Sequence, residues 1–240
     1  MTKENEKNWF WIVKNTIFII IYGIVATLGY STVAEIHIQE PRTLFTPLDH
    51  AIPFVSAFVI PYVFIFYPFL MFTMGYFAYI SSRKFNQFFA ATMLVYVISF
   101  TTYIVFPVMM IRPSPSEMPT DFLSLVMQKY YASDPPLNCF PSLHAASSTL
   151  VAYFLSREKP KYKWVFWSIA FLIILSTLFV RQHVIVDEIA GFAVAYFASW
   201  FAEQKIKEEN ITDAYMNVRI AVTLVAATII SAGLILPYLP

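Results

Sequence analysis

Charged residues and cysteine are both scarce in this chain of 240 residues. Asp, Glu, Lys and Arg together make up 13% of the sequence, whereas a soluble domain carries roughly 25%. The net charge of +1 leaves no basic face to spare, so we expect no nucleic-acid partner. Cys139 is the only cysteine, which excludes a disulfide bond within the chain.

Apolar residues are abundant instead. Hydrophobic residues account for 58% of the chain, and 24 Phe, 15 Tyr and 5 Trp suit lipid-facing and interfacial surfaces. The mean hydropathy is +0.62. Because a helix needs about 20 apolar residues to cross a bilayer, we predict an all-α, polytopic membrane helical bundle that forms one domain over residues 1–240. The expected spans are 10–31, 54–80, 86–107, 142–156, 164–181, 184–202 and 217–238.

Lysine and arginine residues concentrate in alternate loops between these spans. By the positive-inside rule the N-terminus is then cytoplasmic, and the longer loops 32–53 and 108–141 face outward. The first apolar stretch is too long for a signal-peptide core, so we expect it to remain as an anchor. The protein is expected in the plasma membrane. The cations that define the cytoplasmic side are Lys3, Lys7, Arg83, Lys84, Arg157, Lys159, Lys161, Lys163, Lys205 and Lys207.

Three short polar segments each lie at the end of a long apolar stretch. They are Arg112-Pro113, the run from Cys139 to His144, and the run from Arg181 to Asp187. The predicted topology places all three on the same side of the membrane. Cations, two histidines and one carboxylate gathered there indicate phosphoryl chemistry on a lipid.

His183 and Asp187 are four residues apart, so they are neighbours if they share a helix. A carboxylate bonded to one imidazole nitrogen fixes the tautomer and stabilises the charge that develops when the other nitrogen attacks. This arrangement suits His183 as a nucleophile that forms a phosphohistidine. The competing interpretation is an interfacial histidine whose only role is to bond with Asp187.

His144 is the candidate general acid that protonates the leaving oxygen. Proline is favoured at the first helical position, so we expect its helix to begin at Pro141. The N–H groups of Ser142, Leu143 and His144 would then point at an anion, and the Ser142 hydroxyl would donate as well. The alternative is a histidine at a helix end that bonds to a loop carbonyl.

Arg112 and Arg181 are candidate phosphate-binding residues, because a guanidinium matches two phosphate oxygens at once. The alternative for each is an arginine that reaches for lipid headgroups. Glu188 is expected to be a structural or interfacial charge. In the outer loop, Thr120 or Asp121 is expected to cap a short helix. The apolar face predicted for it consists of Phe122, Leu125, Val126 and Tyr130.

The three motifs resemble those of the type 2 phosphatidic acid phosphatase (PAP2) superfamily, which includes vanadium haloperoxidases and sphingolipid phosphotransferases. Pro141 to His144 match the family's Pro-Ser-x-His, and His183 with Asp187 match its His-x-x-x-Asp. The resemblance covers residues 86–202. It implies a six-helix core, to which 217–238 would add a C-terminal helix. The run 134–140 is similar to the branch near inositol phosphorylceramide synthases.

Two positions depart from the family pattern. Val105 stands where the first motif usually has a lysine, and Thr177 stands where the third usually has an arginine. Arg181 lies four residues after Thr177, so on a continuing helix it would project from the same face and substitute for that arginine. Nothing obvious in the sequence replaces the lysine.

The expected function is a metal-independent lipid phosphate phosphatase without a cofactor. It would hydrolyse a phosphomonoester or pyrophosphate, with phosphatidic acid, phosphatidylglycerol phosphate and polyprenyl pyrophosphate as candidates. One alternative is a phosphotransferase that uses an alcohol acceptor. Another is a non-catalytic transporter or assembly protein. The four histidines show no close metal-ligand spacing, so no metal is expected. The lipid and the oligomeric state stay open.

Overall fold

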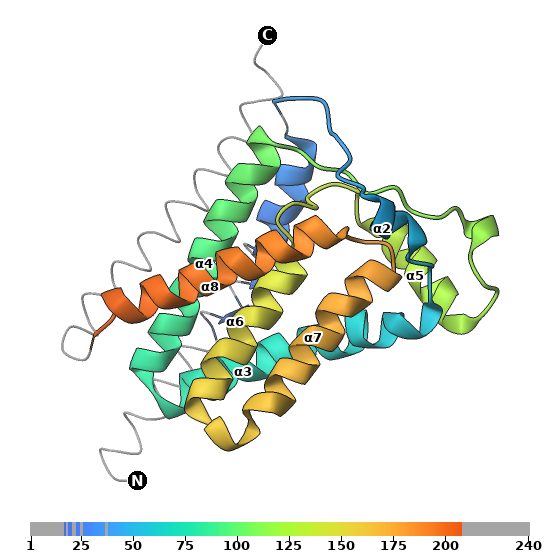
Figure 1. Ribbon diagram of the computed structural model, residues 1–240. Helices are drawn as coiled ribbons and strands as arrows, with labels where there is room; N and C mark the ends of the chain where they lie inside the picture. Colours follow the sequence, from blue (N-terminus) through green and yellow to red (C-terminus); the bar gives the residue numbers. More distant parts are fainter. Residues whose placement is uncertain (1–16, 18, 21–22, 25, 37, 208–240) are drawn as a thin grey trace.

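The computed structural model describes residues 17, 19–20, 23–24, 26–36 and 38–207. These residues form helices and loops, with one isolated bridge between Arg42 and Val108. In the described part of the chain the longer helices pack into the bundle of Figure 1, and two shorter ones, α2 (Pro47–Ala51) and α5 (Phe122–Ser133), lie beside one of its ends. The bundle helices are α3 (Phe66–Ile80), α4 (Ser82–Val105), α6 (Leu143–Glu158), α7 (Lys163–Phe179) and α8 (Ile185–Lys205).

Four helical segments in the described part of the chain are long and apolar enough to cross a bilayer. They confirm the prediction of an all-α membrane bundle, within a few residues at each boundary. The predicted span 10–31 falls mostly outside the described residues, although 26–35 are helical, and 217–238 lies wholly outside them. The four segments are Ser56–Ile80, Arg83–Val105, Pro160–Phe179 and Ile185–Lys205.

Helix α6 is shorter than the four spanning segments and lies in the middle of the bundle. It contacts α3, α4, α7 and α8, and its residues from Ala145 to Ala152 are all buried. Three of these, Ser147, Ser148 and Thr149, are polar. A helix surrounded by other helices has no lipid to face, so small and polar side chains are tolerated there.

The second predicted span, 54–80, is helical throughout from Ser56 but not regular. A 3-10 turn at Ser56–Phe58 is followed by a π-helical segment at Ile60–Ile65, which runs into α3. Pro61 lacks the N–H that a regular helix needs, and π segments often mark functional sites. Here the π segment carries Tyr62, whose ring lies 4.7 Å from the ring of His144.

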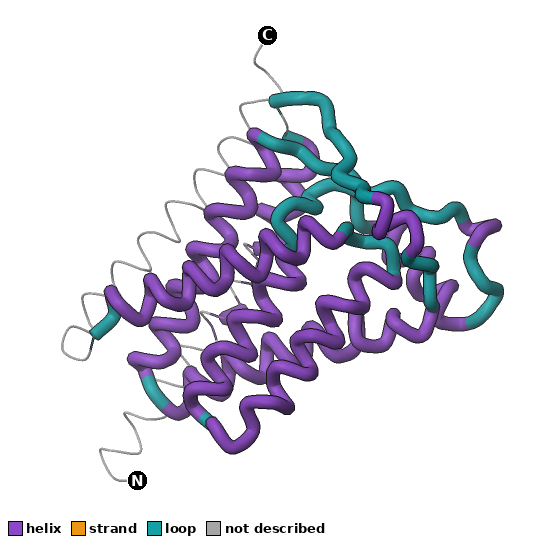
Figure 2. The backbone as a smooth tube through the Cα atoms, in the orientation of Figure 1, coloured by secondary structure: helices purple, strands orange, loops and turns teal. Residues whose placement is uncertain are grey.

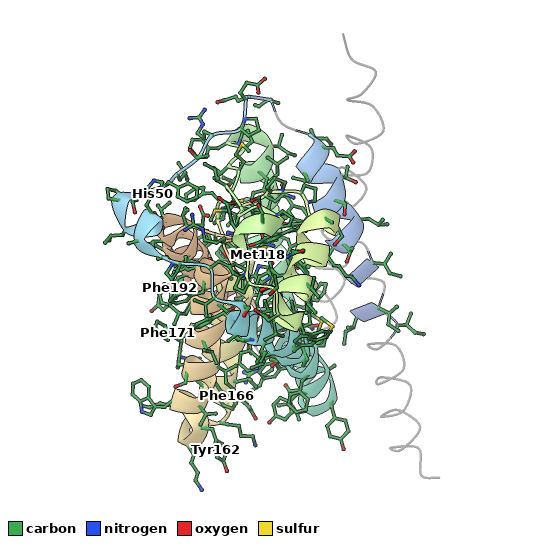
Figure 3. The ribbon with its side chains drawn as sticks, turned by 90° about the vertical axis from the view of Figure 1, so that its right-hand side faces the viewer. His50, Met118, Tyr162, Phe166, Phe171 and Phe192 are labelled. Atoms are coloured by element: carbon green, nitrogen blue, oxygen red, sulfur yellow. The ribbon has the colours of Figure 1, made fainter. Side chains whose placement is uncertain are left out.

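The polar motifs all lie at one end of the bundle. The C-terminal ends of α4 and α7 and the N-terminal ends of α6 and α8 meet there, and Figure 2 shows the longer loops gathered at this end. Figure 3 shows His50 near this end and Tyr162 at the far end of α7. The three motifs therefore share one end of the molecule, as the predicted topology requires.

Helix α5 confirms the helix predicted for the outer loop, with Asp121 as its N-cap. Its predicted apolar face is wrong in part, because Phe122 and Leu125 are exposed at 73% and 53%. The face that packs against Tyr62 and Met118 is offset from the predicted one. It is formed by Leu123, Val126, Met127, Tyr130 and Tyr131.

Helix α8 approaches the start of α6 closely at Gly191. A Cβ atom at this position would lie 2.4 Å from the carbonyl oxygen of Ser142 and 2.9 Å from Cβ of Ala145. The Ser142 carbonyl belongs to the main chain, so it cannot move aside as a flexible side chain could. Small residues let membrane helices pack this tightly, so Gly191 sets the distance between α6 and α8.

We predict that Gly191→Ala destabilises the protein by about 1–3 kcal/mol, the usual cost of overpacking a core. The measurement is the midpoint of thermal unfolding in detergent. Gly75→Ala is the control, because a Cβ there meets nothing within 4 Å. Equal midpoints for the two variants would contradict this prediction, because they would show that α6 and α8 can move apart without a loss of stability.

Candidate active site

Residues from the three motifs come together at the loop-bearing end of the bundle. The imidazole rings of His144 and His183 have centroids 5.8 Å apart. The Ser142 N–H donates to the carbonyl of Asp187 at 3.0 Å. Nη2 of Arg112 donates to Oε1 of Gln182, beside His183, at 2.5 Å. Three segments far apart in sequence thus form one polar cluster.

His183 and Asp187 are paired as the spacing predicts. Nδ1 of His183 lies 3.4 Å from Oδ2 of Asp187, and both side chains are buried. The same Oδ2 accepts the Val184 N–H at 3.0 Å, which fixes the carboxylate at the start of α8. Because Nδ1 faces the carboxylate, Nε2 is the nitrogen left for a substrate.

Charge around His183 favours its protonated form. Burial acts to lower the pKa of His183, but the carboxylates of Asp187, Glu188 and Asp134 outweigh it, and the pKa is raised above its ordinary value. The neutral imidazole that can attack phosphorus is therefore the minor form until the pH exceeds this raised pKa.

His144 lies in the first turn of α6, with its ring packed against two aromatic rings. The centroids of Tyr62 and Phe66 are 4.7 and 4.4 Å from it. Its Nε2 is buried and has no hydrogen-bond partner among the described residues. The aromatic rings hold the imidazole in place, and Nε2 remains available to a ligand.

The start of α6 corrects one prediction. The helix begins at Leu143 with Ser142 as N-cap, two residues later than expected, and Pro141 precedes the cap. The Ser142 hydroxyl accepts the Ala145 N–H at 3.2 Å, and its own N–H bonds to Asp187. The Ser142 N–H is therefore already used, and the first-turn N–H groups of Leu143 and His144 remain for an anion.

Arg112 reaches the cluster but is already bonded within it. Its guanidinium donates to Oδ2 of Asp134 at 2.9 Å and to the Asp134 carbonyl at 2.5 Å, in addition to Gln182. It also lies over the ring of Tyr131, 4.7 Å from the centroid. Burial raises the pKa of Asp134, and Arg112 partly offsets this effect. Only Nε of Arg112 is without a partner among the described residues.

Arg181 does not lie where the sequence suggested. Helix α7 ends at Phe179, and Arg181 has φ of 52°, so the helical spacing from Thr177 does not continue to it. Its guanidinium donates to the carbonyls of Asp49 and Ile52 at 2.8 and 3.0 Å and lies over the Phe45 ring. Arg181 therefore holds the loop that contains Asp49 and Ile52, and its guanidinium does not replace the missing arginine at Thr177.

Asp49 makes a second attachment of the same loop and was not singled out in the sequence. It is buried, and its Oδ1 accepts the Ile185 N–H at 2.8 Å, at the start of α8. Burial acts to raise the pKa of Asp49, but hydrogen bonds from Thr46 and Ile185 and the charge of Arg181 hold the pKa low. The signal that could have found it is the capping box of α2, in which Thr46 is the N-cap and Asp49 follows three residues later.

Glu188 is buried, not interfacial, with 6% of its surface exposed. Its Oε1 accepts a hydrogen bond from the Thr177 hydroxyl at 2.7 Å. Thr177 is the position at which the resemblance leads one to expect an arginine. The site thus contains a carboxylate paired with a hydroxyl where a guanidinium was expected.

Comparisons with known proteins identify the family of this chain. A family model for the PAP2 superfamily matches residues 31–201. The chain belongs to the PAP2 superfamily. One curated relative is the inositol phosphorylceramide synthase catalytic subunit aur1 of Schizosaccharomyces pombe, 34% identical over 65 residues. That match covers 27% of this chain and 15% of the relative. No solved structure gave a significant match.

We predict that the His183 imidazole titrates above about 6.5, the ordinary pKa of histidine, and that Asp187→Asn moves the titration to lower pH by removing one carboxylate. Nitrogen-15 spectra of histidine-labelled protein in detergent measure both. Glu203→Gln, at the opposite end of α8, is the control and should leave the titration unchanged. A pKa of His183 that is the same in the wild type and in Asp187→Asn would contradict the pairing of the two side chains.

Proposed function

We propose that this protein is a lipid phosphate phosphatase that acts through a phosphohistidine at His183. The observation that carries the proposal is the convergence of buried polar atoms without partners in the described part of the chain. They include Nε2 of His144, Oδ1 of Asp187 and Oε2 of Glu188. Buried polar atoms are normally satisfied, so a cluster of open ones is expected where a polar ligand binds.

The first half of the reaction follows from the positions of the two histidines. Nε2 of His183 attacks phosphorus, a P–N bond forms, and the bond from phosphorus to the lipid oxygen breaks. His144 gives its proton to that leaving oxygen. Asp187 stabilises the positive charge on His183, and the first-turn N–H groups of α6 stabilise the phosphoryl oxygens.

The second half returns the enzyme to its starting state. Water attacks the phosphohistidine, the P–N bond breaks, and its electron pair returns to His183. His144, now neutral, takes the proton of the attacking water. Phosphatidic acid, phosphatidylglycerol phosphate and polyprenyl pyrophosphate are the candidate substrates, since each presents a terminal phosphate at a membrane surface.

A second candidate is transfer of the phosphoryl group to an alcohol. The similarity to an inositol phosphorylceramide synthase subunit favours it, although the matched segment is short. Turnover in oxygen-18 water distinguishes the two. Labelled inorganic phosphate as the main product supports the phosphatase. Negligible phosphate, with a phosphodiester that forms only when an alcohol is added, supports the transferase.

We predict that His183→Ala and His144→Ala each remove nearly all phosphate release from phosphatidic acid in detergent micelles. Asp187→Asn should cost less, because it weakens the nucleophile without deleting it. Vanadate, which imitates the five-coordinate phosphoryl state, should inhibit, and EDTA should not. His50→Ala is a control in the same outer region. Full activity in His183→Ala would falsify the assignment.

We also propose that the site faces outward, in the plasma membrane, with a cytoplasmic N-terminus. The charge distribution between the loops supports this orientation. Cys139 is buried, with its thiol directed at the carbonyls of Pro136 and Leu137, so it is a poor target for labelling reagents.

We therefore predict the labelling of single new cysteines in a Cys139→Ala background. Thr120→Cys, exposed in the loop before α5, should react with a membrane-impermeant maleimide in intact cells. Lys161→Cys, exposed at the opposite end, should react only after the membrane is opened. The reverse pattern would place the site in the cytoplasm.

A further inference from the structure

Glu188 is a buried carboxylate beside the proposed nucleophile with one oxygen unused. Its Oε1 accepts from the Thr177 hydroxyl, whereas its Oε2 has no hydrogen-bond partner within the described part of the chain. Leaving a buried polar atom unpaired is costly, and a buried carboxylate more so. The Ser142 hydroxyl also lies near this carboxylate, and Oε2 remains open to a hydrogen from a ligand.

No cation of the described residues forms an ion pair with Glu188. The two arginines of the cluster are committed elsewhere, Arg112 to Asp134 and Gln182, and Arg181 to the carbonyls of Asp49 and Ile52. An ionised carboxylate only accepts hydrogen bonds. In this ionised form Oε2 would repel a phosphate oxygen, whereas a hydroxyl that carries a hydrogen would fit.

The Thr177–Glu188 pair is attached directly to the segment that carries the nucleophile. The carbonyl of Thr177 accepts the N–H groups of Gln182 and His183 at 2.9 and 3.3 Å. Glu188 itself follows Asp187, the partner of the His183 imidazole. The carboxylate is close enough for its charge to help raise the pKa of His183. Glu188 thus lies close to the His183 imidazole.

We propose that Glu188, oriented by Thr177, binds the hydroxyl-bearing nucleophile that resolves the phosphohistidine. This inference rests on the proposed function. The attacking oxygen forms a bond to phosphorus, the bond to His183 breaks with its electron pair returning to nitrogen, and the attacking hydroxyl gives its proton to Nε2 of His144.

Glu188 accepts a second hydrogen in that step, which orients the nucleophile. In water this is the other hydrogen of the same molecule. In a polyol it is the hydrogen of a hydroxyl adjacent to the attacking one. Both sources present the same chemistry to Oε2, and Glu188 gains and loses no proton in either case.

The test separates formation of the phosphohistidine from its breakdown. Full-length protein is mixed with phosphatidic acid labelled with phosphorus-32 in detergent micelles, and acid-labile label on the protein is followed in a single turnover. In Glu188→Gln we expect near-normal formation and breakdown slowed by about tenfold or more, as for loss of a hydrogen bond to a charged group. The phosphoenzyme should therefore accumulate.

Two matched variants serve as comparison. Thr177→Val keeps the shape but removes the hydroxyl that orients the carboxylate, so it should slow the same step to a smaller extent. Glu203→Gln makes the same chemical change at the far end of α8, where Glu203 pairs with Arg157, and should leave both steps unchanged. A thermal unfolding midpoint is recorded for each variant, so that a folding defect is recognised.

Added glycerol or myo-inositol distinguishes the source of the hydroxyl. If a polyol accelerates breakdown of the phosphohistidine and its phosphate ester is formed, the subsite binds an alcohol. If polyols do not change the rate of breakdown, the subsite binds water. In both cases Glu188→Gln must be the slower enzyme. Slow formation without accumulation, or unchanged rates in a folded Glu188→Gln, would overturn the inference. Absence of labelled wild-type protein would instead overturn the proposed function, and this inference with it.

Discussion

The contact between the first turns of α6 and α8 is the constraint on which the rest of the site depends. The Ser142 N–H bonds to the Asp187 carbonyl, and Gly191 lies directly against the Ser142 carbonyl. Both contacts involve main-chain atoms of Ser142. They bring His144 and His183 within ring contact, since each imidazole lies within a few residues of the junction. Loss of this proximity would separate the two histidines even if both helices stayed intact.

The electrostatics of the site differ from those of a simple cationic phosphate pocket. Arg112 is bonded to Asp134 and Gln182, and Arg181 holds the loop that contains Asp49. Two guanidinium groups thus serve mainly to fix loops over the helix ends. The N–H groups at the start of α6 and the two imidazoles are then the groups left to interact with the phosphoryl oxygens. The phosphoryl chemistry proposed here therefore depends more on the histidines than on the arginines.

Sequence reasoning succeeded where the determining interactions are local. Hydropathy located the helices, and the four-residue spacing of His183 and Asp187 predicted their pairing, which the structure shows at 3.4 Å. It failed where the partner is distant. The direction of Arg181 depends on a left-handed residue at the end of α7 and on carbonyls of Asp49 and Ile52, more than a hundred residues away. The burial of Glu188 depends likewise on the packing of α7 against α8, which spacing along one helix does not reveal.

Thr177 and Glu188 have to be understood together. An arginine at position 177 would lie beside the Glu188 carboxylate and pair with it, so Oε2 would no longer be open to a ligand. With threonine there, the carboxylate keeps one bonded and one open oxygen. An arginine at position 177 would suit phosphate binding, whereas the threonine found there orients the Glu188 carboxylate, which accepts hydrogen bonds. On this argument, the departure from the family pattern at Thr177 bears on the second half of the reaction, where water and alcohol compete for the phosphoryl group.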